Sequence, residues 1–414
     1  MAEPLIIIGK GMAATRLVDA LSRRALGRYA IAVIGAEQSL AYNRVLLSSL
    51  LAGEVTKPEL ELKPALWWQS KGVTTLYGQK VESIDRIAKT VALADGSVLA
   101  YGKLVLATGS QPVRLPIPGA DKRGVITFRD LNDVAAMQQA ASGQSRAVVI
   151  GGGLLGLEAA YGLALGGAKV TLVHLMDRLM ERQLDGEAAK MLAEAIHVRG
   201  VDIILEAQTA EITGHEHATG VTLKDGRHLP AELVVLAAGI KPNAELAQAC
   251  GLAVGRGIIV DDGLATSDAD IFAIGECAEH HGTVYGLVEP AYEQAEVLAA
   301  RLAQPATVTK PLPEYHGSVT ATNLKVSGVN VFSAGDFGGA EGTQSLVLRD
   351  MALGHYKKLV LNEGRLVGAV LFGDTTDALW YLELIRKGVE ISHLRSDLIF
   401  GRALVERLSQ PQAA

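Results

Sequence analysis

Two glycine-rich turns, about 140 residues apart, constrain the fold of this chain more than any other feature of its sequence. The first follows three isoleucines and reads Gly-Lys-Gly-Met-Ala-Ala over residues 9–14; the second reads Gly-Gly-Gly-Leu-Leu-Gly over residues 151–156. Each separates a short apolar run from an apolar-periodic segment, which predicts a strand, a tight turn and a helix. In that context glycines let the backbone approach a pyrophosphate, and the helix start offers unpaired N–H groups. We therefore expect two bound dinucleotides, with electrons passing between them.

The chain repeats one architectural unit. In each half, a later apolar strand is followed by a turn of small residues, which reads Ala-Thr-Gly at 107–109 and Ala-Ala-Gly at 237–239. Further on, the proline-bearing segment 304–313 is typical of a linker, and residues 324–331 alternate apolar and polar side chains. We expect strands over 4–8, 30–34, 103–106, 147–150, 169–173, 233–236, 257–262 and 271–276, and near 73–83 and 89–99. Alternation at strand spacing continues over 324–331, and a further run covers 356–361. Helices are expected over 15–21, 153–165 and 292–302.

Bulk composition narrows the function classes. With 414 residues, 49% of them hydrophobic and 20% charged, the chain is long enough for two or three domains and too apolar for disorder. A net charge of −6 favours neither nucleic acid nor an anionic membrane surface as a partner. The sequence has no run of about 18 uncharged apolar residues, so we expect no membrane span. Its first apolar run is expected to be a strand rather than a signal peptide, which predicts a cytoplasmic protein.

A third motif, Thr-Ser-Asp-Ala-Asp-Ile-Phe-Ala-Ile-Gly-Glu-Cys-Ala, occupies residues 266–278. Together with the two glycine turns and the turn at 107–109, it resembles the two-dinucleotide flavoprotein reductases over residues 4 to about 300. That family usually has aspartate where Glu276 stands. The resemblance implies a glutathione-reductase-like α/β fold, with tandem Rossmann-type domains for FAD and NAD(P). Its expected domains are an FAD-binding domain over 1–112 and 243–306, an NAD(P)H-binding domain over 113–242 and a small α+β C-terminal domain over 307–414.

Four segments make the resemblance more specific. Residues 41–49, 151–158, 274–278 and 324–336 together look like the flavin portion of assimilatory NAD(P)H nitrite reductases. The related flavin electron-transfer subunits of assimilatory nitrate reductases carry the same pattern. Large nitrite reductases continue into cysteine-rich cluster and siroheme modules, which this sequence does not contain. We therefore expect that the chain does not reduce nitrite by itself.

The resemblance also implies which residues form the site. Arg44 and Arg129 are expected to reach the flavin cofactor, and Glu158 is expected to face the nicotinamide pocket as the catalytic residue. Glu37, just past the second strand, is placed to accept hydrogen bonds from ribose hydroxyls, and Glu276 to hold a ribitol hydroxyl. The expected cofactor-binding residues are Gly9, Gly11, Met12, Ala13, Ala14, Glu37, Arg44, Ser48, Val81, Ala107, Thr108, Gly109, Arg129, Gly275, Glu276, Gly151, Gly153, Leu154, Leu155, Gly156, His174 and Gly239.

A flavin accepts a hydride and returns single electrons, so it links nicotinamides to one-electron acceptors. The leading expectation is an FAD-dependent NAD(P)H oxidoreductase that passes electrons to a separate cluster- or heme-bearing nitrate or nitrite reductase. Relatives that reduce disulfides or peroxide need a cysteine beside the flavin in the first domain, and no cysteine precedes Cys250. A rubredoxin or ferredoxin reductase is the alternative enzyme, and a flavin-holding sensor is the alternative of another class. A homodimer is left open.

Metal and cluster chemistry is limited by the residues available. Cys250 and Cys277 are too few for a four-cysteine cluster or zinc knuckle, and both are expected to be small buried side chains. Residues 215–217, His-Glu-His, lie in a polar stretch with no third ligand nearby in the sequence. The pair His280-His281 is expected to be structural or to adjoin the flavin. No metal site is expected.

Coenzyme choice depends on His174, which ends the strand after the second glycine turn. Relatives that prefer NADH usually have glutamate there, because a carboxylate binds both ribose hydroxyls and repels a 2′-phosphate. His174 removes that repulsion, and Arg178 offers positive charge; alternatively, His174 donates to the ribose of NADH and Arg178 faces solvent. We expect weakened discrimination, with NADPH accepted alongside NADH.

Overall fold

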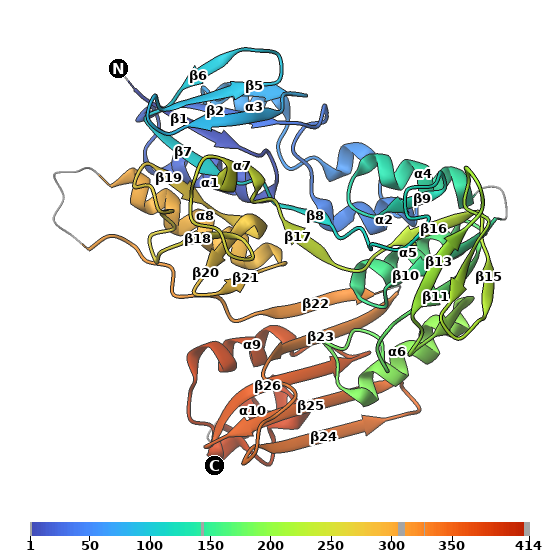
Figure 1. Cartoon of the computed structure of the whole chain (residues 1–414). Coiled ribbons are helices and arrows are strands. Elements are labelled where there is room, and N and C mark those ends of the chain that lie inside the picture. The colour runs from blue at the N-terminus through green and yellow to red at the C-terminus, as the bar shows by residue number, and fades with distance from the viewer. Residues whose placement is uncertain (1, 142–144, 305–310, 327, 410–414) are drawn as a thin grey trace. The chain divides into compact units, whose positions relative to one another are not determined.

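The chain folds into two compact units, each built from two separate stretches of sequence. The structure is a computed structural model that describes residues 2–141, 145–304, 311–326 and 328–409 (Figure 1). The first unit takes Met1–Val113 and Ile240–Ser318, and the second takes Arg114–Gly239 and Val319–Ala414. The expected division into three domains stays a prediction.

The core of the first unit is a five-stranded parallel sheet in the order β19-β7-β1-β2-β3 (Figure 1). Its central strands are runs of isoleucine, leucine and valine that are buried on both faces, as is usual for parallel strands covered by helices. The strands are β1 (Glu3–Ile8), β2 (Tyr29–Gly35), β3 (Thr74–Tyr77), β7 (Lys103–Leu106) and β19 (Ile271–Ala273). Helices α1 (Met12–Arg24) and α8 (Val288–Ala303) pack against each other. Strand β19 thus lies beside β7, although residues 107–270 separate the two in sequence.

Smaller elements complete the first unit. An antiparallel sheet has the order β4-β5-β6, a second small sheet has the order β18-β20-β21, and β8 pairs with β17. Their bounds are β4 (Val81–Asp85), β5 (Thr90–Leu93), β6 (Val98–Ala100), β8 (Ser110–Pro112), β17 (Ile240–Pro242), β18 (Ile258–Val260), β20 (Ala278–His280) and β21 (Thr283–Val284). The short helices are α2 (Leu47–Leu51), α3 (Ala65–Ser70) and α7 (Glu245–Ala249), with 3₁₀ turns at Arg44–Leu46, Lys57–Leu60 and Gly275–Cys277.

The two long strands predicted over 73–83 and 89–99 are wrong, because each is broken into two. Gly78 has a φ of +65°, a left-handed conformation that ends β3 before β4 begins. Asp95 ends β5, since its carboxylate accepts a 2.9 Å hydrogen bond from the N–H of Ser97 and folds the chain into a turn. Residues that favour strands stand on both sides of each break, so composition alone joins segments that the backbone separates.

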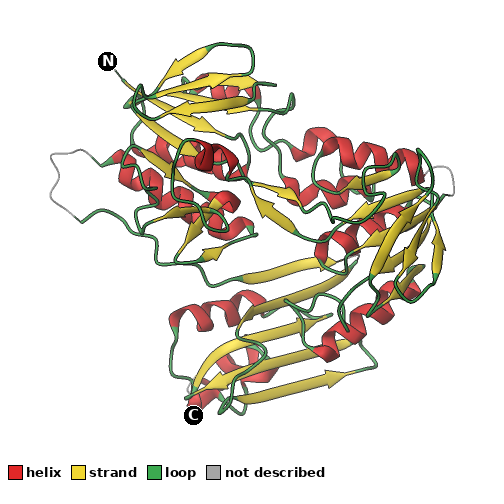
Figure 2. Ribbon diagram, in the orientation of Figure 1, coloured by secondary structure: helices red, strands yellow, loops and turns green. Residues whose placement is uncertain are grey.

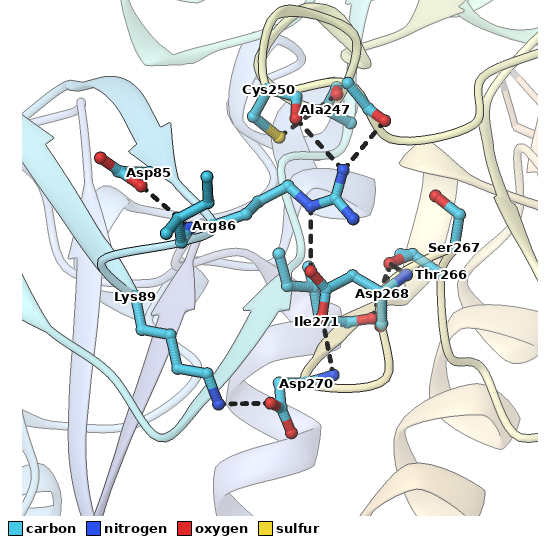
Figure 3. A network of polar contacts seen from close by, with 12 residues as sticks. Asp85, Arg86, Lys89, Ala247, Cys250, Thr266, Ser267, Asp268, Asp270 and Ile271 are labelled. Atoms are coloured by element: carbon cyan, nitrogen blue, oxygen red, sulfur yellow. Dashed lines mark hydrogen bonds and ion pairs between the residues drawn. The ribbon is translucent and has the colours of Figure 1, made fainter.

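A polar network ties the segment after β4 to the residues around β19 (Figure 3). The Nε of Arg86 donates to Asp268 at 2.9 Å, and its Nη1 donates to the carbonyl oxygen of Gly251 at 3.1 Å. Lys89 and Lys103 both form ion pairs with Asp270. These contacts join sequence positions more than 160 apart, so they fasten the late segment of the first unit to its early one.

The second unit contains another five-stranded parallel sheet, in the order β12-β11-β10-β16-β9. A separate antiparallel sheet has the order β13-β14-β15. The strands are β9 (Val125–Thr127), β10 (Arg146–Ile150), β11 (Lys169–Val173), β12 (Val201–Ile204), β13 (Thr209–Thr213), β14 (Gly220–Leu223), β15 (His228–Pro230) and β16 (Leu233–Leu236). The helices are α4 (Leu131–Ala141), α5 (Leu154–Leu165) and α6 (Gly186–Val198). Strand β10, the turn after it and α5 repeat the arrangement of β1, its turn and α1.

The C-terminal part of the second unit is an antiparallel sheet in the order β22-β23-β26-β25-β24, with helices α9 and α10 (Figure 2). Its strands are β22 (Ala321–Val326), β23 (Val329–Gly335), β24 (Gln344–Asp350), β25 (His355–Asn362) and β26 (Arg365–Phe372); the helices are α9 (Ala378–Lys387) and α10 (Arg402–Ser409). The alternating run over 324–331 covers the end of β22 and the start of β23, which pair in antiparallel fashion. Tyr356 on β25 donates to Asp185 at 2.7 Å and so fixes this sheet to the residue that caps α6.

The expected linker over 304–313 lies partly outside the described residues, which omit 305–310. Among the helices that the structure describes, none is long and apolar enough to cross a membrane.

Candidate functional site

The first glycine turn has the geometry that a dinucleotide turn needs. Gly9 has a φ of +108°, and a Cβ there would stand 2.0 Å from the carbonyl oxygen of Ala107, so only glycine fits. At Gly11, by contrast, no described residue other than Gly11 and its two chain neighbours has a heavy atom within 4 Å of the place a Cβ would take. Gly11 caps α1, whose first internal hydrogen bond runs from the N–H of Thr15 to Gly11. The N–H groups of residues 12–14 therefore have no acceptor within the helix.

The second turn repeats this geometry. Gly151 has a φ of +126°, and a Cβ there would stand 2.3 Å from the carbonyl oxygen of Ala237. A Cβ on Gly156 would stand 1.9 Å from the oxygen of Gly151, so helix and strand pack closely. Apart from Gly153 and its two chain neighbours, no described residue has a heavy atom within 4 Å of a Cβ placed on Gly153. Gly153 caps α5, and the N–H groups of residues 154–156 precede its first internal hydrogen bond. Both turns thus present an open cradle lined with backbone donors, which fits a pyrophosphate.

Just past β2 the structure brings together three polar side chains. The hydroxyl of Tyr42 donates to the carboxylate of Glu37 at 2.9 Å, and Nη1 of Arg44 donates to that hydroxyl at 2.8 Å. Arg44 also forms an ion pair with Glu37. Burial is the largest influence on Arg44 and disfavours its charge, but Tyr42, Glu37 and Glu276 outweigh it and raise the pKa of Arg44. Glu37 and Glu276, two predicted cofactor residues, therefore both lie within electrostatic reach of Arg44, a third.

Glu276 lies against the small-residue turn that follows β7. The hydroxyl of Ser110 donates to Oε2 of Glu276 at 2.8 Å, and a Cβ on Gly109 would stand 3.9 Å from the same oxygen. Thr108 is held by Asn243: its hydroxyl donates to the Asn243 carbonyl at 2.7 Å, and the Asn243 amide donates back at 2.9 Å. Hydrogen bonds therefore join the turn after β7 to two residues far away in the sequence, Asn243 and Glu276.

His174 is buried at the end of β11, and both of its ring nitrogens have partners. Nδ1 accepts a 2.9 Å hydrogen bond from the N–H of Gly152, inside the second glycine turn. Nε2 lies 3.1 Å from a carboxylate oxygen of Glu181. An Nδ1 that accepts is unprotonated, so Nε2 carries the hydrogen and donates it to Glu181. Arg178 pairs with the adjacent Asp177 at 3.0 Å.

The other predicted site residues are distributed over the two units. Met12, Ala13 and Ala14 form the first turn of α1, and Leu154 and Leu155 form that of α5. Glu158 lies on α5, partly buried, and Gly239 follows β16 with a φ of +106°. The rest are Ser48 in α2, the buried Val81 at the start of β4, Gly275 in the 3₁₀ turn after β19, and Arg129, partly buried after β9 in the second unit. The contacts predicted between these residues and cofactors stay predictions.

Two residues with structural importance for the site were missed. Lys10 is buried between the two glycines of the first turn and donates to the carbonyl oxygens of Glu37 and Ser39. Burial lowers the pKa of Lys10 to about 8, although Glu37 opposes the shift. Gln294 on α8 is 1% exposed and accepts a 2.7 Å hydrogen bond from the N–H of Gly275. Two features of the sequence could have indicated these residues. Lys10 stands inside an apolar turn, and Gln294 is a single amide on an apolar helix face.

Known proteins resemble this chain in sequence. The nitrite reductase [NAD(P)H] of Bacillus subtilis is 44% identical over 390 residues, which cover 94% of this chain and 48% of the relative. The assimilatory nitrate reductase electron transfer subunit of the same species is 41% identical over 397 residues, 96% of this chain and 51% of the relative. The chain thus spans about half the length of these two relatives. They confirm the resemblance that the motifs predicted.

Solved structures and family matches agree with this assignment. A ferredoxin reductase from Rhodopseudomonas palustris has a TM-score of 0.88 at 28% identity, covering 99% of this chain and 100% of that one. Putidaredoxin reductase, in its covalent complex with putidaredoxin, has a TM-score of 0.87 at 27% identity and covers both chains completely. These neighbours confirm the predicted fold class. Residues 321–389 match the rubredoxin NAD⁺ reductase C-terminal domain. Residues 3–295 match the pyridine nucleotide-disulphide oxidoreductases, and the chain belongs to that family.

Proposed function

We propose that this chain is an FAD-dependent NAD(P)H oxidoreductase that passes electrons to a separate redox protein. The observation that carries the proposal is the duplicated turn: Gly11 and Gly153 each leave open space in front of a helix start, one in each unit. FAD supplies the conversion of a two-electron hydride donor into a source of single electrons. In this proposal the first turn holds FAD, with Glu37 and Glu276 on its ribose and ribitol hydroxyls. The second turn holds NAD(P)H, with Glu158 at the nicotinamide.

Disulfide chemistry, which the family name suggests, is not supported by this chain's cysteines. Cys277 is fully buried, and its Sγ donates to the carbonyl oxygens of Leu106 and Ile274. Burial raises the pKa of both Cys277 and Cys250, which disfavours the thiolate that disulfide exchange requires. Neither thiol therefore has the lowered pKa that a nucleophilic cysteine needs.

We further propose a nitrate or nitrite reductase as the electron acceptor. The two Bacillus subtilis relatives support this choice, since both carry nitrate or nitrite reductase in their names. A ferredoxin or rubredoxin reductase is the second candidate, favoured by the R. palustris structure and by the C-terminal domain match. The docking surface for the acceptor decides between the two.

The proposed function is tested by separating its two half-reactions. We expect the purified chain to oxidise NADH or NADPH with ferricyanide, and to reduce neither nitrate nor nitrite, because two cysteines cannot hold a four-cysteine cluster. Addition of a cluster-bearing nitrite or nitrate reductase partner from the same source should restore the complete reaction. Adding rubredoxin or ferredoxin in its place distinguishes the second candidate. Nitrite reduction by the metal-free chain alone would refute the electron-transfer role, and failure to reduce ferricyanide would favour the sensor alternative.

The pairing of His174 with Glu181 bears on coenzyme choice. His174 stands where related folds place the carboxylate that binds the ribose, and Glu181 supplies a carboxylate 3.1 Å from its ring. We therefore expect that Glu181→Gln raises kcat/KM for NADPH relative to NADH by about tenfold. The variant removes the repulsion between the Glu181 carboxylate and the 2′-phosphate of NADPH, and a loss of about 1.4 kcal/mol corresponds to that factor. His174→Glu should instead shift preference toward NADH, chiefly through the KM for NADPH.

Steady-state kinetics with ferricyanide and each coenzyme measure both effects. Glu194→Gln is the matched control, because it makes the same change of charge at an exposed position of α6. If the native chain rejected NADPH, and Glu181→Gln and His174→Glu behaved like the control, neither residue would determine coenzyme choice.

A further inference from the structure

Three potential metal ligands meet at one end of the small sheet β18-β20-β21 in the first unit. The Nε2 atoms of His280 and His281 lie 2.8 Å and 2.7 Å from the same oxygen, Oδ1 of Asp262. One ligand atom from each of the three residues lies within 4.8 Å of the other two. The cluster is separate from the residues assigned to either dinucleotide.

The sheet explains why these side chains converge. Strands β18 and β20 run parallel, and Val260 pairs with His280, so both strands end at the same edge (Figure 1). Asp262 follows β18 by two residues. His281 is the first residue of a two-residue turn between β20 and β21, in which both φ values are positive, 46° at His281 and 72° at Gly282. Such a turn closes a tight hairpin and fixes the direction of its first side chain.

The surroundings hold two of the three ligands firmly. His280 is 2% exposed, and its ring packs against the ring of Tyr315 with a centroid separation of 4.9 Å. The backbone N–H of Tyr315 donates to the carbonyl oxygen of Asp262 at 2.8 Å. His281 is the ligand whose side chain can move, because that side chain is 72% exposed.

A second group of ligands shares the same carboxylate. Asp262, Glu314 and His316 also offer ligand atoms within 4.8 Å of one another, and both Glu314 and His316 are exposed. They flank Tyr315, the residue that packs on His280. Three of the chain's ten histidines therefore gather around one aspartate.

We propose that Asp262, His280 and His281 bind one divalent transition-metal ion, with Zn²⁺ as the best-matched metal. Two imidazoles and one carboxylate suit Zn²⁺, Ni²⁺, Co²⁺ or Cu²⁺, whereas Mg²⁺ and Ca²⁺ prefer oxygen ligands only. Zinc bonds to nitrogen and oxygen are about 2.0–2.2 Å long, which places tetrahedral ligand atoms about 3.4 Å apart. The contacts of 2.7–2.8 Å must therefore open slightly, and the exposed His281 can move to allow it.

The ion would join Asp262, which follows β18, to the end of β20 and the turn between β20 and β21. The ion would thus stabilise the first unit, since it binds the folded arrangement of the three ligands. This inference does not depend on the proposed electron transfer. It replaces the expectation that the pair His280-His281 binds no metal. That expectation rested on neighbouring residues in the sequence, and Asp262 lies 18 positions before His280.

Calorimetric titration of the FAD-loaded full chain with ZnCl₂ tests the proposal. We expect saturable binding of one Zn²⁺ per chain and a rise in melting temperature on Zn²⁺ addition. In His281→Asn, the affinity should fall by at least about tenfold, and the melting shift should disappear. Asparagine is favoured where φ is positive, so this variant removes the ligand while preserving the turn.

His215→Asn, at an exposed histidine of the second unit, is the matched control and should bind Zn²⁺ like the native chain. No saturable binding, or equal binding by His281→Asn and the native chain, would overturn the assignment. Loss of binding in His316→Asn with retention in His281→Asn would also overturn it, by placing the ion on the second group.

Discussion

A Gly11→Leu variant is expected to fold and to purify almost free of FAD. Gly11 has an extended backbone with a φ of −75°, which any residue can adopt. Apart from Gly11 and its two chain neighbours, no described residue has a heavy atom within 4 Å of the place its Cβ would take. The leucine side chain would therefore occupy only the space that we assign to the pyrophosphate. If it prevents two charge-assisted hydrogen bonds of about 1.5 kcal/mol each, FAD affinity should fall by about a hundredfold.

Absorbance at flavin wavelengths measures the FAD content, and circular dichroism with thermal melting measures the fold. The reference is native protein from which FAD has been removed. Gly9→Ala is the contrasting variant: its Cβ would stand 2.0 Å from the Ala107 oxygen at a φ of +108°, so it should lose FAD because the turn itself is disrupted. A Gly11→Leu protein with one FAD per chain would show that the first turn does not bind this cofactor.

Gly153→Leu is expected to give the complementary result, a protein that keeps its FAD but hardly reacts with reduced nicotinamide. Gly153 occupies the same place in the second unit, with a φ of −80° and open space beyond it. The KM for NADH should rise by about a hundredfold, for the same two lost hydrogen bonds. Flavin reduced chemically with dithionite should still pass its electrons to ferricyanide at the native rate.

Gly156→Ala controls for disruption of the turn, since its Cβ would stand 1.9 Å from the oxygen of Gly151. That variant should melt at a lower temperature, whereas Gly153→Leu should not. Loss of FAD from Gly153→Leu, or an unchanged KM, would contradict the assignment of the two turns to different dinucleotides.

Features confined to a few consecutive residues were predictable from the sequence. The strand, turn and helix around Gly9 and around Gly151 follow from glycines placed between an apolar run and an apolar periodicity. The structure adds the reason for Gly9 and Gly151. The carbonyl oxygen of Ala107 leaves no room for a Cβ on Gly9, and that of Ala237 leaves none for a Cβ on Gly151. The resemblance also implied that Glu276 and the turn at 107–109 serve the same cofactor, and Ser110, next to that turn, donates to Glu276.

Features that depend on chain direction or on distant partners were not predictable in this way. Residues that favour strands lie on both sides of Gly78 within 73–83, although the backbone turns there. His174 was recognised as important, but its second partner, Glu181, lies in a loop without periodicity. Asp262 joins His280 only because β18 and β20 run parallel, and sequence pattern does not specify which strands pair.

The late position of β19 has a consequence for biosynthesis. Strands β1, β2, β3 and β7 can assemble as soon as residue 106 has left the ribosome, but β19 and Glu276 come more than 160 residues later. At 5–20 residues per second, this interval lasts roughly 10–30 s. During that time β7 is an exposed sheet edge, which is prone to pairing with other chains. A nascent chain therefore depends on completing its second parallel sheet before it can close the first, and premature termination anywhere between residues 107 and 270 leaves that edge uncovered.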